Sequence, residues 1–148
     1  MNFRFATRCT VLCVAPLLCV GCGKFQQARE CGTFVKTVNA WLTSPGASPS
    51  NAPPLKAPHQ IAEEARRTAQ HYADLSKSLA DLHVQGEELA PRVERYEEIA
   101  NSAARALREV ADSLDQGDLE KARQKRIEFD TVAHGEAPLV KEINGVCR

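Results

Sequence analysis

The sequence is poor in the residues and motifs that carry chemistry. Aromatic residues make up 5% of its 148 positions, and Met1 is its single methionine. None of the four histidines follows a glutamate by three residues, so the Glu-x-x-His pair of di-metal carboxylate bundles is absent. No Cys-x-x-Cys-His, Gly-x-Ser-x-Gly, His-Glu-x-x-His or P-loop sequence occurs either. We therefore predict a protein that is not an enzyme, with no catalytic residue, no metal site and no cofactor. The histidines, including His71 beside Tyr72, are interpreted as structural or surface residues.

Acidic residues are missing before Glu30, and the chain as a whole has no excess of positive charge. It has 19 basic and 19 acidic side chains, a formal net charge of zero. Removal of residues 1–21 would take away Arg4 and Arg8, leaving 17 basic side chains against 19 acidic ones. Phosphate contacts need a basic surplus, so the composition argues against a nucleic-acid partner.

The acid-free start is followed by a short apolar stretch. Residues 1–8 carry two arginines, and residues 9–20, CTVLCVAPLLCV, form an apolar run. About a dozen residues is roughly half of what a helix needs to cross a ~30 Å hydrocarbon layer. A basic start, a short apolar centre and small residues after it are typical of an export signal. A transmembrane anchor is the alternative interpretation, and the length argues against it.

The end of this run, LCVGC at residues 18–22, resembles a bacterial lipobox. In that family the pattern is Leu, two small or apolar residues, and the cysteine that receives diacylglycerol; here Cys19 stands where leucine is usual. The resemblance implies removal of residues 1–21 and acylation of Cys22, whose acyl chains would hold the protein to a bilayer surface. Because Gly23 rather than Asp follows the cysteine, it also implies the outer membrane in a two-membrane host. An ordinary signal peptide is the alternative.

Two cysteines would remain for other purposes after export. Cys31 and Cys147 lie near the two ends of the mature sequence, and an even number of cysteines in an exported chain favours pairing. We predict a disulfide between them, which would close nearly the whole domain into one loop. A metal site is the alternative, but two isolated cysteines without paired spacing make a poor one.

The spacing of apolar residues predicts a first helix over residues 24–43. Residues 43–58 follow with five prolines and three serines, and they are expected to form a Pro-rich loop because proline lacks the amide hydrogen that a helix needs. The apolar stripe of the first helix consists of Phe25, Ala28, Cys31, Phe34, Val35, Val38, Trp41 and Leu42.

A regular heptad pattern runs from Ile61 to Leu114 and has two interpretations. One is a single long helix, and the other is a hairpin of helices 59–83 and 87–115 that breaks around Gly86 and Pro91. We favour the hairpin, since glycine disfavours helix and proline is tolerated only in a first turn. A last helix over 118–143 is predicted, with a kink or interruption near Glu136.

Four helices joined by short connections predict an all-α fold, an antiparallel up-down-up-down four-helix bundle over residues 22–148. In that topology the start of the first helix and the end of the fourth lie together, which suits the predicted Cys31–Cys147 bond. The expected function is that of a non-catalytic, membrane-anchored lipoprotein of the bacterial cell envelope. It would act as a structural or protein–protein interaction module with an unidentified protein partner. A carrier or sensor that binds a small apolar ligand within the bundle is the alternative; an internal cavity would favour it.

Overall fold

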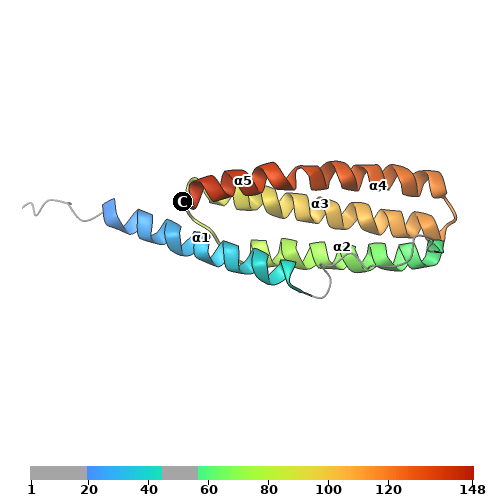
Figure 1. The fold of residues 1–148 in the computed structure, drawn as a ribbon, viewed down its shortest axis with the longest axis horizontal. Coiled ribbons are helices and arrows are strands. Elements are labelled where there is room, and N and C mark those ends of the chain that lie inside the picture. Colours follow the sequence, from blue (N-terminus) through green and yellow to red (C-terminus); the bar gives the residue numbers. More distant parts are fainter. Residues whose placement is uncertain (1–19, 45–56) are drawn as a thin grey trace, which may run out of the picture.

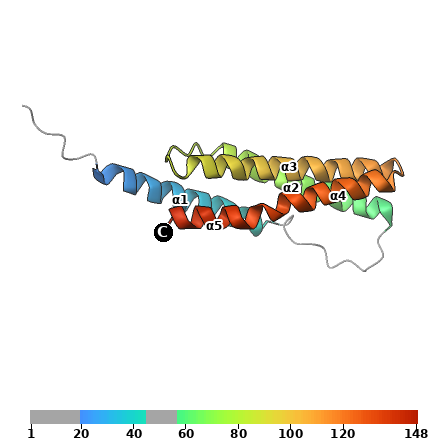
Figure 2. The same ribbon diagram turned by 90° about the horizontal axis from the view of Figure 1, so that it is seen from above.

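The computed structural model describes residues 20–44 and 57–148, and within these ranges every regular element is a helix (Figure 1). The helices are α1 (Val20–Leu42), α2 (Pro58–Ala80), α3 (Ala90–Asp115), α4 (Leu119–His134) and α5 (Glu136–Val146). Helices α4 and α5 follow one another along the same side, so the chain runs in four antiparallel passes (Figures 1 and 2). The predicted four-helix bundle is therefore confirmed. Most of the predicted signal peptide and residues 45–56 of the predicted Pro-rich loop lie outside the described residues.

The hairpin, and not the single long helix, is what the structure contains between Ile61 and Leu114. Helix α2 ends at Ala80, and residues 81–89 form the turn to α3. His83 has a positive φ of 46°, which no helix residue adopts. Helix α3 begins at Ala90 instead of the predicted residue 87, because Pro91 lies in its first turn, where a missing amide hydrogen is harmless.

Gly117 and Asp118 form the turn between α3 and α4. Gly117 has a φ of 73°, a left-handed conformation that costs glycine little. The Oδ1 atom of Asp118 accepts a hydrogen bond from the backbone N–H of Lys121 at 3.0 Å, so Asp118 caps α4 from outside the helix. The helix consequently begins at Leu119.

The predicted interruption near Glu136 is confirmed, since Gly135 separates α4 from α5. The buried Tyr96 of α3 donates a hydrogen bond from its hydroxyl to Glu136 Oε1 at 2.7 Å. This bond holds the first residue of α5 to α3. Helix α5 continues to Val146, three residues beyond the predicted end of the last helix.

Small residues fill the contact between α2 and α3, which is the most extensive in the bundle. Methyl side chains let two helix backbones approach closely and leave little space between them. The seam begins one residue later than predicted: Ile61 is 39% exposed and Ala62 is fully buried in its place. The alanines of this contact that are completely buried are Ala62, Ala69, Ala100, Ala103, Ala104 and Ala111.

Helix α1 covers only half of the bundle. It packs against the second half of α2 and reaches Val146 and Cys147 at the end of the chain, whereas in the described part of the chain the first half of α2 has α3 as its main neighbour (Figures 1 and 2). The apolar stripe predicted for α1 is therefore partly wrong. Cys31 and Phe34 are buried, but Phe25, Val35 and Leu42 are 77%, 42% and 54% exposed.

Candidate functional site

The end of the bundle where α1, the 81–89 turn and the C-terminus meet contains the features that the sequence singled out. We call it the disulfide end. Cys31 of α1 and Cys147, the residue after α5, form the predicted disulfide, with Cα atoms 5.6 Å apart. The side-chain amide of Gln27 donates a hydrogen bond to the carbonyl oxygen of Val146 at 3.0 Å. These two links attach α1 to the last turn of the chain.

Glu30 attaches the same part of α1 to the α2–α3 turn. Its carboxylate accepts hydrogen bonds from the backbone N–H of Gly86 at 3.0 Å and of Gln85 at 3.3 Å, and from the side-chain amide of Gln26 at 2.9 Å. The Gln26 amide, together with the two backbone donors, lowers the pKa of Glu30 below its ordinary value. A Cβ atom at Gly86 would lie 3.0 Å from Glu30 Oε2, so a larger residue there would displace the carboxylate by a few tenths of an ångström.

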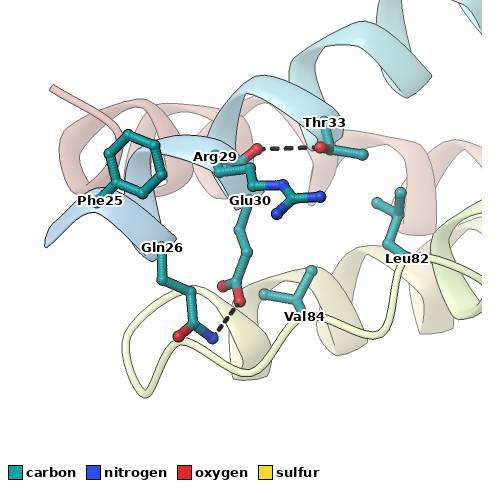
Figure 3. Close-up of a pocket in the computed structure, with 7 residues that line it drawn as sticks. All are labelled: Phe25, Gln26, Arg29, Glu30, Thr33, Leu82 and Val84. Atoms are coloured by element: carbon teal, nitrogen blue, oxygen red, sulfur yellow. Dashed lines mark hydrogen bonds between the residues drawn. The ribbon is translucent and has the colours of Figure 1, made fainter. Parts of the chain in front are cut away.

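A cleft of about 690 Å³ lies at the disulfide end, beside this carboxylate (Figure 3). Its apolar surface comes from Phe25 of α1 and from Leu82 and Val84 of the α2–α3 turn, and Arg29 supplies a positive charge. Its volume is in the range of small-molecule sites. It lies at the surface of α1 and not within the helical core, which differs from the internal cavity that a carrier would have between its helices.

A second cluster, around His71, was not recognised as a unit in the sequence. The Trp41 indole is stacked on the imidazole of His71 at 4.5 Å between ring centroids, and its Nε1–H donates to the His71 carbonyl oxygen at 2.9 Å. His71 Nδ1 lies 3.3 Å from the Ser44 hydroxyl. Burial lowers the pKa of His71, so the neutral imidazole is favoured. The contacts tie the end of α1 to α2, a structural role for His71 that agrees with its interpretation from the sequence.

The exposed part of α1 carries more basic than acidic side chains, and Glu87 and Glu88 of the α2–α3 turn line a cleft together with Lys24. Lys24, Arg29 and Lys36 all lie on exposed positions of the helix. The only acidic residue within α1 is Glu30, whose carboxylate is directed to the backbone of the 85–86 turn. The periodicity of apolar residues does not identify this exposed face from the sequence, because the face mixes apolar and basic residues.

The charged runs at 62–67 and 120–126 lie on solvated helix faces with ion pairs. Arg66 pairs with Asp115 of α3, and Lys125 lies 2.8 Å from Glu109 and 2.9 Å from Glu128. Exposed pairs of this kind contribute little to stability, because water and salt screen the charges. These runs therefore need no ligand to explain them.

Within residues 20–44 and 57–148 the structure has no cluster of three or more histidine, cysteine, aspartate or glutamate side chains arranged to hold a metal ion. In the same ranges no helix has a stretch long and apolar enough to cross a bilayer. Cys22 lies in the first turn of α1, and its side chain is outside the described part. Comparison with protein families, with curated proteins and with solved structures finds no match to this chain.

Proposed function

We propose that this protein is a lipoprotein of the bacterial cell envelope, anchored by acylation of Cys22, that acts without catalysis as a structural or protein–protein interaction module. The observation that carries the proposal is the Cys31–Cys147 disulfide in a helical bundle. Disulfides persist in oxidising compartments outside the cytosol, which agrees with an exported chain. The lipobox-like LCVGC sequence, residues 18–22, runs into the start of α1, the helix that bears one of the two cysteines.

The position of Cys22 supports direct attachment of the bundle to the membrane. Nine residues separate it from Cys31, and both belong to α1. A helix rises 1.5 Å per residue, so the anchor and the disulfide end are about 14 Å apart along a continuous helix. The protein is then held at the membrane surface without a flexible tether, as suits a structural component. The outer membrane is the expected location in a two-membrane host, because Gly23 follows the anchor.

Exposed apolar side chains at the opposite end of the bundle support the interaction role. Leu119 and Ile127 of α4 are 62% and 56% exposed, beside the half of the bundle that α1 does not cover. Ile61 of α2 is exposed at the same end. Apolar groups exposed on a small domain are candidates for contact with a partner protein.

Mass spectrometry and palmitate labelling of the native protein test the anchor. We expect label in the wild-type chain and in Cys13→Ser, a control that changes another cysteine of the signal segment. The Cys22→Ser variant is expected to carry no label. Label in Cys22→Ser, or a mature N-terminus other than Cys22 in the wild-type protein, would contradict the proposal.

The cleft at the disulfide end is the place to test the second candidate, a carrier or sensor for a small apolar ligand, although it lies outside the helical core. A fluorescent fatty acid is a suitable probe, because the cleft combines Arg29 with Phe25, Leu82 and Val84. Saturable binding that Val84→Asp abolishes, with unchanged binding in a matched Ile127→Asp variant, would support this candidate. Equal binding to both variants would exclude the cleft as the ligand site.

A further inference from the structure

We infer that the exposed face of α1 rests on the surface of an anionic bilayer, with Phe25 inserted at the interface, so that the lipoprotein lies on the membrane along this helix. The inference rests on the proposed acylation of Cys22. It adds an orientation and a lipid class to the anchor. We define the exposed face of α1 by Phe25, Arg29, Val35, Lys36 and Leu42.

Proximity to the anchor is the first argument. Phe25 is one helical turn after position 22, and it has the most exposed side chain among the large apolar residues of the described chain. Figure 3 shows its ring projecting from the start of α1, away from Leu82 and Val84. A phenylalanine in this position gains by leaving water for the acyl–headgroup boundary, where apolar residues of interfacial helices are buried by about 5–10 Å.

Charge is the second argument. Arg29 and Lys36 lie on the exposed face, Lys24 is next to Phe25, and the one acidic side chain of α1 is held by the 85–86 backbone. Basic residues within a Debye length of an anionic membrane are attracted to it, and α1 offers three of them against one acid, Glu30. Glu87 and Glu88 of the neighbouring turn line a cleft together with Lys24, so Arg29 and Lys36 carry most of the attraction. The mature chain would have 17 basic and 19 acidic side chains, so the surplus is a local property of α1.

The shape of the face is the third argument. Ala28 and Gly32 lie on exposed positions between the larger residues, and a Cβ atom built at Gly32 meets nothing within 4 Å. The backbone of α1 can therefore approach a flat surface closely. Val35 and Leu42 continue the apolar contact along the helix, at 42% and 54% exposure.

The attachment of α1 to the bundle transmits this contact to the whole molecule. The disulfide holds its first half, and the Trp41–His71 contact holds its second half. Contact along α1 would therefore set the orientation of every helix. A second copy of the chain is a poorer occupant of the same face, because Arg29 and Lys36 of one α1 would meet the same basic residues of the other.

The test uses the full lipidated protein reconstituted in vesicles of phosphatidylcholine with phosphatidylglycerol, some of it bromine-labelled to quench tryptophan. Phe25→Trp and Leu119→Trp place a second tryptophan on the exposed face of α1 and on α4, and both positions are exposed enough to accept it. We expect bromolipid to quench the added fluorescence of Phe25→Trp and to leave that of Leu119→Trp unchanged. Replacing Lys24, Arg29 and Lys36 by glutamine should reduce the Phe25→Trp quenching about twofold or more, because each charge adds to the attraction. Replacing the exposed Arg95, Arg105 and Arg123 instead should not.

The outcomes separate the orientation from the anchor. Quenching at position 25 that depends on the three charges supports the inference. A protein that floats with the vesicles through its acyl group but shows no quenching at position 25 overturns the inference and leaves the anchor standing. If the unquenched protein also cross-links to itself through α1, the exposed face of α1 binds a second copy, and the inference is again overturned while the anchor stands. Absence of lipid on Cys22 overturns both.

Discussion

Breaking the Cys31–Cys147 bond is expected to destabilise the fold about as much as the most damaging single substitutions in its core. The two cysteines are separated by 116 positions, and the chain-entropy relation gives about 4–5 kcal/mol for closing a loop of that length at 25 °C. For a domain slightly above 100 residues, 1 kcal/mol corresponds to a shift in Tm of roughly 4 °C. Reduction should therefore lower the Tm by roughly 15–20 °C.

The structure also predicts where the destabilised protein opens first. Within residues 23–42 of α1 only Cys31 and Phe34 are buried, so α1 loses much of its attachment when the bond is broken, whereas α2 and α3 retain their extensive contact. Amide hydrogen exchange should therefore accelerate within residues 23–42 well before it accelerates in α3. The effect should fade toward Trp41, whose hydrogen bond to the His71 carbonyl persists.

Calorimetry with and without reductant measures the effect without altering the core, and thiol titration verifies that the bond is open. The Cys31→Ala/Cys147→Ala variant repeats the measurement without reductant, and its Tm should not respond to the reductant. A Tm that falls by less than about 3 °C after complete reduction would refute the reasoning. Such a result would mean that packing of Phe34 and the Glu30 and Gln27 hydrogen bonds alone hold α1 in place.

Three further predictions concern single positions. Tyr96→Phe removes the hydroxyl that donates to Glu136 and should lower the free energy of unfolding, measured by denaturant titration, by about 1–3 kcal/mol. An unchanged titration midpoint would show that this hydrogen bond does not stabilise the fold. Gly117→Ala places a side chain at a φ of 73° and should cost about 1 kcal/mol, while Gly145→Ala in α5 should be neutral or stabilising. Because the folded-state pKa of Glu30 is lowered, its contribution to stability should be complete above the unfolded pKa of about 4.5 and lost as the pH falls through the folded-state pKa. Glu30→Gln should make the free energy of unfolding depend less on pH in this acid range. The same pH dependence in the variant and the wild-type protein would contradict the prediction.

Helix number, order and approximate ends could be predicted from the sequence because they depend on local signals. Gly86 and Pro91 mark the hairpin, Gly117 and Asp118 mark the next turn, and apolar spacing marks what lies between them. The disulfide could be predicted as well, since the bundle topology brings both ends of the chain together.

The faces of α1 could not be predicted, because they depend on which neighbours each turn of the helix has. Phe25 satisfies the same apolar spacing as Phe34, yet Phe34 packs against Tyr96 while Phe25 lies where the bundle offers it no cover. The burial of Ala62 in place of the predicted Ile61 has a similar cause. Close packing of α2 on α3 is available to methyl side chains, and periodicity alone does not rank a buried alanine above an isoleucine.

The weak burial of α1 and the disulfide are two parts of one arrangement. A helix that places both of its faces against its own bundle has no surface left for a membrane or a partner, and a helix that keeps one face free forfeits burial. At about 25 cal/mol per Å² of apolar surface, leaving side chains such as Phe25 and Leu42 exposed gives up several kcal/mol of stabilisation. The covalent bond at Cys31 supplies a contribution of the same order that needs no further burial. It therefore allows α1 to remain fixed to the bundle while its outer face stays available.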